Sequence, residues 1–226
     1  MKTKEKKKRR FNFKKFIIFI VLIILLSLVV YKLFNTKTKN IVILNNDYYS
    51  DDEIIDTAGI YNYPNFLTLN SSRIKKKLEK LDLVDEVKIK KKFGFILQID
   101  VKENKILYYI RSKDEYMLSN YKSIKLDNIT GVPTLINYVP EEIEKSFIKE
   151  FSKLDKNIIS LISEIEYNKT QYDEKRFLLY MNDGNQVYIT VTKIDILSKY
   201  VDIVKKLNNK KGILYLDSGN YFEIKE

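Results

Sequence analysis

Three clusters of neighbouring acids are the residues best suited by type and spacing to do chemistry. They occupy residues 51–53, 141–142 and 173–174, and paired carboxylates can share acid–base work or hold a cation. The first cluster directly follows Ser50 and opens a short helical segment. Helix capping and attraction to the helix N-terminus account for its three acids, and the other two clusters have similar structural explanations. We predict no catalytic residues in these clusters.

Serine and lysine are the remaining candidates for nucleophilic chemistry. Neither Ser160 with Ser163 nor Ser198 with Lys199 has the S-x-x-K spacing, and a Ser–Lys dyad needs a desolvated lysine. The chain has no cysteine and no histidine, which excludes thiolate nucleophiles, Cys/His zinc sites and Ser-His-Asp triads. No glycine-rich phosphate loop is present. The sequence therefore predicts a protein that is not an enzyme and that has no cofactor and no metal site.

The formal net charge of +11 suggests a polyanion-binding protein until the charges are located. Of the 41 basic and 30 acidic residues, nine basic residues and one acid lie within residues 1–15, and Lys32 adds one more basic residue. The rest of the chain has 31 basic and 29 acidic residues and is close to neutral. The charge belongs to the N-terminal tip, so it is weak evidence for nucleic-acid binding by the folded part.

An apolar segment follows this basic tip. Residues 16–31 are apolar except for Ser27. Extending the segment to residue 34 gives a helix of about 28 Å, long enough to span a bilayer. A cleaved signal peptide is the alternative, but residues 31–40 offer no small-residue cleavage site. We predict a retained anchor with the basic N-terminus in the cytoplasm and about 190 residues outside it.

The next 65 residues predict a compact α+β module. Residues 41–44 form a strand, and Ser50 with Glu53 makes a capping box for a helix that Gly59 ends. Ser71 or Ser72 caps a second helix, whose apolar face has helical spacing. Two strands close the module, and the predicted order is strand, helix, helix, strand, strand. The strands lie at residues 84–90 and 95–102, joined at residues 91–94.

The closing hairpin is unusually basic at its turn, where Lys90, Lys91 and Lys92 are consecutive. A nucleic-acid-binding hairpin is one interpretation. The predicted topology places it outside the cytoplasm, away from chromosomal DNA. We therefore expect an ordinary amphipathic hairpin whose lysines are solvated or face the anionic wall and membrane. Its core side would pack on the two helices through Phe95, Leu97, Ile99 and Val101.

Residues 106–226 predict a second mixed α/β domain with a mostly antiparallel sheet. Two amphipathic helices are expected, the first with Pro140 at its start and acids in its first turn. A hairpin turns at residues 183–184. The expected strands are 108–112, 116–119, 122–126, 176–183, 185–191 and 212–217, and the helices are 140–154 and 193–207, the latter with Leu197, Tyr200, Val201, Val204 and Leu207 on its core face.

The order of basic tip, span, strand–helix–helix–strand–strand module and β-rich domain resembles the bacterial cell division family FtsQ/DivIB. The module is similar to the POTRA domain of that family. The similarity lies in the segments IVILNND, SDDEIIDTAGI and the stretch from LNSSRIKKK to DVKEN. The chain departs from the family pattern at Asn104, where an arginine is common. The resemblance implies residues 1–15 as cytoplasmic tail, 16–34 as transmembrane helix, 35–40 as stalk, 41–105 as POTRA-like domain and 106–226 as FtsQ-type β domain.

The resemblance also implies function. It suggests a non-enzymatic, single-pass scaffold of the division septum, with its C-terminus outside the cytoplasm. Its partners would be the bitopic coiled-coil proteins of the FtsB/DivIC and FtsL types, with septal wall synthases as further candidates. Two other classes stay open on the residues alone. They are a membrane-anchored extracytoplasmic cell-wall enzyme and a POTRA-bearing secretion or assembly component.

The C-terminal segment is the candidate binding site. Large apolar groups lie on and beside the expected strand 212–217. They could simply complete the core, or the strand could be an edge left free for pairing with a partner chain. The family resemblance favours the second interpretation. The residues assigned to partner binding are Tyr215, Leu216, Tyr221 and Phe222.

Overall fold

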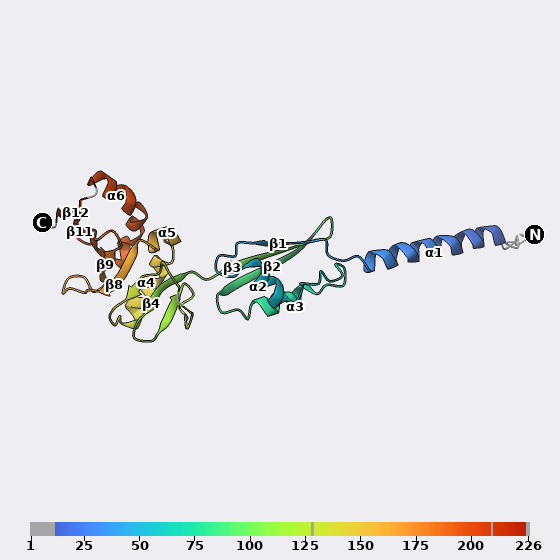
Figure 1. The fold of residues 1–226 in the computed structure, drawn as a ribbon, viewed down its shortest axis with the longest axis horizontal. Coiled ribbons are helices and arrows are strands. Elements are labelled where there is room, and N and C mark those ends of the chain that lie inside the picture. The colour runs from blue at the N-terminus through green and yellow to red at the C-terminus, as the bar shows by residue number, and fades with distance from the viewer. Residues whose placement is uncertain (1–11, 128, 209, 225–226) are drawn as a thin grey trace, which may run out of the picture. The chain divides into compact units, whose positions relative to one another are not determined.

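The computed structural model describes residues 12–127, 129–208 and 210–224 (Figure 1). Most of the predicted cytoplasmic tail, residues 1–15, lies outside the described residues. The chain divides into two compact units, residues 1–102 and residues 103–226.

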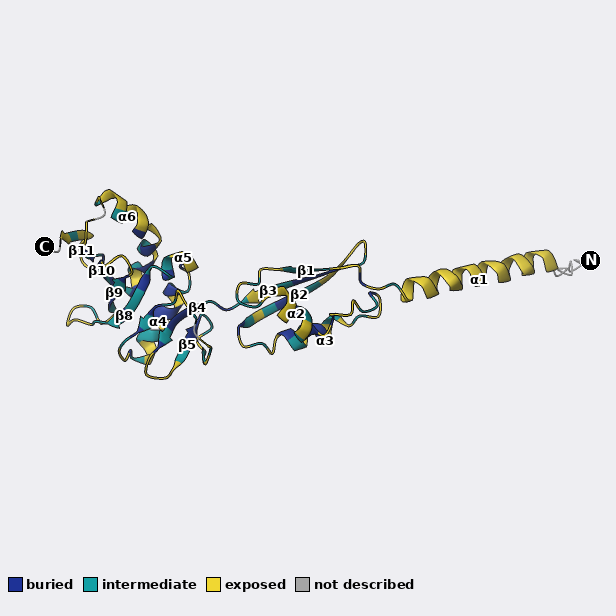
Figure 2. Cartoon of the chain, viewed as in Figure 1, coloured by how far each residue is buried: buried dark blue, intermediate teal, exposed yellow. Residues whose placement is uncertain are grey.

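The first unit begins with α1 (Phe13–Phe34), the one helix in the described part of the chain that is long and apolar enough to cross a membrane. It starts three residues before the predicted span because the side chain of Asn12 accepts a hydrogen bond from the backbone N–H of Lys15. None of its residues is buried (Figure 2). Within the described residues nothing covers its apolar surface, which fits a helix solvated by lipid.

The module after α1 has the predicted order of elements. β3 is the central strand, and β1 runs parallel to it with Asn40 opposite Ile96. The core combines residues from both helices with residues from the sheet, among them Ile54 and Leu78 with Ile99. The elements are β1 (Asn40–Leu44), α2 (Asp51–Ala58), α3 (Ser71–Leu78), β2 (Val84–Lys92) and β3 (Ile96–Glu103).

The capping box is present as the sequence indicates. The Ser50 hydroxyl accepts from the backbone N–H of Glu53, and the Glu53 carboxylate accepts from the backbone N–H of Ser50. The hydrogen bonds that the backbone N–H and the hydroxyl of Ser50 donate to this carboxylate lower the pKa of Glu53. Gly59 ends α2 in the left-handed region at φ +71°.

The N-cap predicted for α3 is wrong. The cap is Asn70, not Ser71 or Ser72, because the helix begins at Ser71 and the Asn70 side chain accepts a hydrogen bond from the backbone N–H of Arg73.

Replacing Asn70 with alanine should destabilise α3 by about 1 kcal/mol, because the N–H of Arg73 loses its acceptor. Ser72→Ala is the matched control, since Ser72 lies inside the helix and past the cap position. Hydrogen exchange of the α3 amides measures the effect. Equal loss of protection in the two variants would contradict the assignment of Asn70 as the cap.

The closing hairpin differs from its prediction at one residue. Leu97, Ile99 and Val101 are fully buried, as expected. Phe95 does not pack on the helices: it lies in the turn with φ +63°, and its ring meets the edge of Phe66 at a centroid distance of 5.5 Å. The strand β3 begins only at Ile96, so the buried alternation that seemed to include Phe95 starts at Leu97.

The second unit is a mixed sheet of nine strands with helices packed against it. It is mostly antiparallel, with parallel pairs β4–β7, β7–β8 and β10–β11. The strand order is β12-β11-β10-β9-β8-β7-β4-β5-β6. The elements are β4 (Ile106–Ile110), β5 (Glu115–Leu118), β6 (Ser123–Ile124), β7 (Thr134–Leu135), α4 (Glu141–Phe151), α5 (Lys156–Ile159), β8 (Ile162–Tyr167), β9 (Arg176–Met181), β10 (Gln186–Thr190), the 3-10 helix η1 (Val191–Lys199), α6 (Tyr200–Lys206), β11 (Gly212–Tyr215) and β12 (Tyr221–Ile224).

The segment predicted as one helix at residues 193–207 is instead η1 followed by α6. Leu197 and Tyr200 are buried, as predicted, but Val201 is exposed. A 3-10 helix has three residues per turn, so its buried face drifts away from the face extrapolated with 3.6 residues per turn. This helical crossover lets β11 return parallel to β10.

The expected terminal strand at residues 212–217 is not the edge of the sheet. β11 lies between β10 and a further strand, β12, which pairs with it in antiparallel register from Tyr215 opposite Tyr221 to Gly212 opposite Ile224. The edge on this side is therefore β12. This shifts the predicted docking edge by one strand toward the C-terminus.

Candidate functional site

The acidic clusters fill structural positions. Residues 51–53 form the first turn of α2, and Glu141 opens α4, where it pairs with Lys145 at 2.5 Å. The Asp173 side chain accepts from the backbone N–H of Lys175 in a turn before β9. Among the described residues no group of three or more acids could hold a metal ion. None of these clusters offers a site for chemistry.

The terminal hairpin β11–β12 is anchored at its start by a buried polar network. The N–H of Gly212 donates to the side-chain oxygen of Asn185 at 2.9 Å, and Asn185 is 2% exposed. The Asn185 amide group donates to the hydroxyl of Tyr200, which donates to the Asp183 carboxylate. Burial raises the pKa of Tyr200, so its hydroxyl keeps its proton at neutral pH. The network fixes β11 beside β10.

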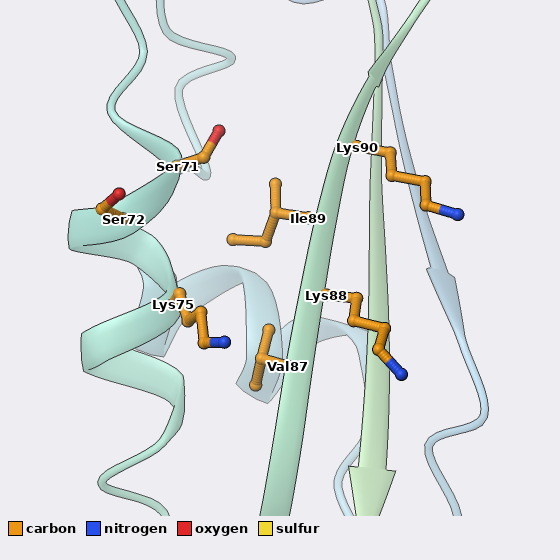
Figure 3. Close-up of a pocket in the computed structure, with 7 residues that line it drawn as sticks. All are labelled: Ser71, Ser72, Lys75, Val87, Lys88, Ile89 and Lys90. Carbon is orange, nitrogen blue, oxygen red and sulfur yellow. The ribbon is translucent and has the colours of Figure 1, made fainter.

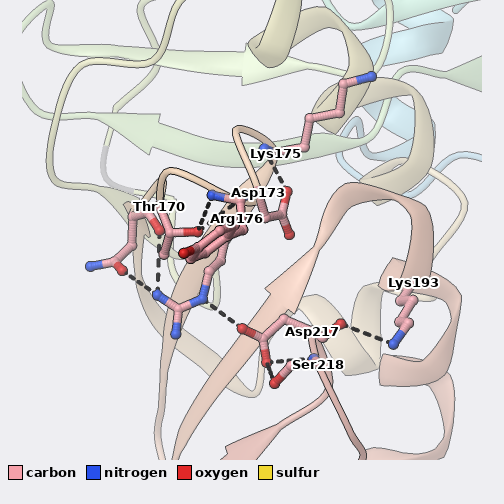
Figure 4. A network of polar contacts seen from close by, with 9 residues as sticks. Thr170, Asp173, Lys175, Arg176, Lys193, Asp217 and Ser218 are labelled. Atoms are coloured by element: carbon pink, nitrogen blue, oxygen red, sulfur yellow. Dashed lines mark hydrogen bonds and ion pairs between the residues drawn. The ribbon is translucent and has the colours of Figure 1, made fainter.

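A second anchor holds the end of β11 (Figure 4). Arg176 of β9 donates through Nε to Asp217 at 2.6 Å and through Nη1 to the side chain of Asn168 at 2.6 Å. The Arg176 and Asp217 side chains are only 13% and 10% exposed. Lys193 donates to the Asp217 carbonyl, and the N–H of Ser218 donates to its carboxylate. The loop between β11 and β12 is thereby tied to the body of the sheet.

Burial alone would raise the pKa of Asp217. The hydrogen bond and charge of Arg176, together with hydrogen bonds from Ser218, outweigh it and hold the pKa below its ordinary value. Asp217 is therefore ionised at neutral pH, and the ion pair is intact there.

A ladder of stacked side chains crosses from β9 to the edge strand. The Arg176 guanidinium lies 3.8 Å from the ring centroid of Tyr188. Tyr188 stacks on Tyr215 at 5.2 Å, and Tyr215 stacks on Tyr221 at 4.4 Å. These pairs follow the strand register, in which Tyr188 lies opposite Tyr215 and Tyr215 opposite Tyr221. The ladder joins β9 to β12 through side-chain contacts and ends at the edge strand.

The structure brings the four predicted binding residues onto one hairpin but gives them different roles. Leu216 is 2% exposed and belongs to the core, and Phe222 also packs against the core. Tyr215 lies within the ladder, and Tyr221 is half exposed on the edge strand.

Sequence reasoning missed Ile224, which is exposed on β12, and the anchors Asn185, Arg176 and Asp217. The turn signal at residues 219–220 before an apolar run could have revealed β12. The anchors have no local signal, because their partners lie far along the chain.

A second surface lies in the first unit, between α3 and the strand β2 (Figure 3). Val87 and Ile89 point toward α3 from β2, while Lys88 and Lys90 point away from it (Figure 3). Ser71, Ser72 and Lys75 line the helix side. β2 is an edge strand of its three-stranded sheet, so this groove runs beside a second unpaired edge.

Comparison with known proteins finds DivIB proteins among the relatives of this chain. Residues 36–104 match the family model of the FtsQ-type POTRA domain. The chain is 31% identical to the cell division protein DivIB of Bacillus subtilis over 98% of its length and 88% of that protein. It is 27% identical to DivIB of Brevibacillus brevis, covering 83% of this chain and 74% of the other. The solved extracytoplasmic domain of DivIB from Geobacillus stearothermophilus aligns with 48% of the chain and 97% of that domain, at 24% identity and a TM-score of 0.39.

Proposed function

The chain belongs to the DivIB family of bacterial cell division proteins, and on that premise we propose that it is a single-pass scaffold of the divisome that binds FtsB/DivIC-type and FtsL-type partners through β12. Proteins of this family are not catalysts, which removes the cell-wall enzyme as an alternative, and a division role replaces the secretion or assembly role. The basic N-terminus lies in the cytoplasm, α1 crosses the membrane, and both folded units lie outside.

One observation carries this proposal: β12 is the terminal strand of a nine-stranded sheet, and no other strand of the described chain pairs with its outer edge. Such an edge presents a row of free N–H and C=O groups, to which an extended segment of another chain can add as a further strand. Natural edges are usually protected by prolines, lysines or bulges. The sequence of β12, YFEI, has no proline and no lysine, and Glu223 is its one charged residue.

The side chains of β12 suit a partner that adds a strand. Tyr221 and Ile224 are about half exposed and lie on opposite faces of the strand, so each can pack on the side chains that an added strand places on that face. The two anchors and the ladder hold the edge rigid before binding, which lowers the ordering cost of association. Bitopic partners anchored in the same membrane are also held at a high effective concentration. Septal wall synthases are further candidate members of the assembly.

The test replaces the exposed side chains of the edge. We expect full-length protein with Tyr221→Lys and Ile224→Lys to capture coexpressed FtsB/DivIC- and FtsL-type proteins at least about tenfold less tightly, because buried contacts of this kind contribute more than about 1 kcal/mol each. Lysine on an edge strand also blocks strand pairing. Affinity measured in detergent or nanodiscs gives the result.

The matched control carries Tyr138→Lys and Tyr172→Lys, which are two exposed tyrosines outside the terminal hairpin. It should capture the partners as the natural protein does. A second variant ends after Gly219, which removes β12 together with its core-packing Phe222 and leaves the buried residues Leu214 and Leu216 in place. Undiminished capture by both the lysine variant and the shortened chain would overturn the assignment of the site to β12.

The groove between α3 and β2 is a second docking surface in the same scaffold. Its partly exposed Ile89, with the buried Val87 next along the same face, lies beside an unpaired edge to which an extended peptide could add. We assign it to contacts with other division proteins, distinct from the partners of β12.

A further inference from the structure

One end of the POTRA-type module is joined to α1 without a free linker. The N–H of Thr36 donates to the carbonyl of Leu33 near the end of α1, and its hydroxyl donates to the carbonyl of Lys32. The carbonyl of the same Thr36 accepts from the N–H of Phe66 in the module. Only Asn35 separates the last residue of α1 from this contact. The end of the module that contains Thr36 therefore cannot move away from the end of α1.

Three segments are fastened together at this end (Figure 1). Lys37 bridges to Asn65, and both the N–H and the hydroxyl of Thr38 donate to the carbonyl of Pro64. The N–H of Lys39 donates to the carbonyl of Phe95 in the β2–β3 turn. This end of the module is thus built from residues 36–39, residues 61–69 and the hairpin turn.

The hairpin turn is clamped in place. The Lys91 ammonium donates to the carbonyls of Leu69 and Leu67 at 2.8 and 3.2 Å. It also lies 5.6 Å from the ring centroid of Phe66, and Phe66 meets Phe95 edge to face. With the base of the turn held in this way, Phe93 at its tip points fully into solvent, with an exposed fraction of 102%.

The charged side chains at this end are all basic, and its exposed side chains also include aromatic groups and, at Leu67, an aliphatic one. Residues 36–39, 61–69 and 90–95 contain five lysines and no acid. Phe93 is the most exposed large apolar residue in the described part of the chain, and Tyr61 and Tyr63 are also exposed. We call these groups the basic aromatic rim. It consists of Lys37, Lys39, Tyr61, Tyr63, Lys92 and Phe93.

We propose that the basic aromatic rim binds the anionic surface of the bilayer that holds α1. The inference rests on the proposed placement of α1 in the membrane. Tyrosine favours the membrane–water interface, an exposed phenylalanine inserts among acyl chains, and lysines near the surface attract anionic headgroups. The direct connection at Thr36 keeps the rim within reach of the headgroups. The effective lipid concentration at the rim is therefore high, and even individually weak contacts with headgroups form. A docked rim fixes the height and tilt of the module above the membrane.

The chain contains no tryptophan, so a single introduced tryptophan reports its own surroundings. Full-length protein with Phe93→Trp is placed in vesicles of three parts phosphatidylcholine to one part phosphatidylglycerol, with and without bromine on the acyl chains. We expect emission at shorter wavelength than in detergent and strong quenching by the brominated lipid. The matched control is Tyr172→Trp, a similarly exposed site in the second unit, which should show neither effect.

The dependence of docking on charge distinguishes binding of the rim to anionic headgroups from mere proximity of residue 93 to lipid. In the Phe93→Trp background, Lys37→Gln, Lys39→Gln and Lys92→Gln should lower the ratio of docked to free module by about fivefold per lysine. The quenching should then be largely lost. Lys113→Gln, Lys125→Gln and Lys169→Gln remove the same charge from exposed positions of the second unit and should leave the quenching unchanged. Raising the salt concentration should weaken docking in the same way.

Retention on the vesicles through an alkaline wash tests α1 separately. If the protein stays in the vesicles but the emission of the Phe93→Trp variant matches that of the Tyr172→Trp variant, the rim proposal fails and the anchoring stands. If the protein washes off the vesicles, both the rim proposal and the anchoring by α1 fail. Quenching that is independent of the rim lysines and of salt would also overturn binding to an anionic surface.

Discussion

Replacing Gly212 with alanine is expected to detach the edge strand β12 and to abolish partner capture. A Cβ at this position would collide with the carbonyl oxygen of Glu223 and meet the ring of Phe222 at 2.9 Å. The backbone oxygen cannot turn away as a flexible side chain would, so β12 must shift by enough to break its pairing with β11. Hydrogen exchange of the β12 amides in full-length protein should become fast, while β9 and β10 stay protected.

Gly219→Ala is the control for this change. It lies in the loop of the same hairpin, and an added Cβ would meet the ring of Tyr221 at an ordinary 3.4 Å. We expect native exchange and native capture in this variant. Capture that survives in Gly212→Ala, with β12 shown to be exchanging freely, would mean that the partner does not need an ordered edge strand.

The second large effect is expected at the ion pair that holds the hairpin loop. Arg176→Met should lower the free energy of unfolding of the second unit by about 3 kcal/mol, because Asp217 is then a buried carboxylate without its partner. The variant also removes the first rung of the ladder, the cation over the Tyr188 ring. Denaturant unfolding followed by tyrosine fluorescence or hydrogen exchange measures the loss.

Arg111→Met is the matched control, since Arg111 pairs with Glu164 at 3.6 Å on the surface of the same unit. An exposed pair of this kind contributes less than about 1 kcal/mol. Equal destabilisation by the two arginine substitutions would contradict the role given to the Arg176 anchor.

The same pair predicts a pH dependence. The pKa of Asp217 is lower in the folded protein than its ordinary value of 3.8, so the folded state favours the ionised form. Its contribution to stability is full above about pH 4 and is lost as the pH falls through the lowered folded-state pKa. Asp217→Asn should therefore be less stable than the natural protein at pH 7, and the two should become equally stable in strong acid. A difference that is unchanged down to about pH 2 would contradict the lowered pKa.

The parts of the fold that the sequence predicts are those with local causes. The capping box of Ser50 and Glu53 and the left-handed Gly59 act within one helix, so α2 can be predicted without tertiary information. The apolar length of α1 is equally local. The alternation in β3 identifies Leu97 to Val101 as core, and it misleads only at Phe95, where the chain is still turning.

The candidate site is less predictable because it depends on pairing between distant residues. Tyr215 and Tyr221 are visible in the sequence as aromatic residues near the end, but whether their strand is an edge depends on β12, a strand of four residues. The ladder requires the register between β10 and β11, which are joined by a helical crossover. Arg176 and Asp217 are 41 residues apart, and no local pattern links them.

The most direct test of the scaffold account is hydrogen exchange of full-length protein in nanodiscs, with and without the FtsB/DivIC- and FtsL-type proteins of the same cell. We expect the outward-facing amides of β12 (Tyr221–Ile224) to gain protection when the partners bind, because the outer edge of β12 becomes hydrogen-bonded. Bound partners that leave exchange of β12 unchanged while protecting another surface would contradict it.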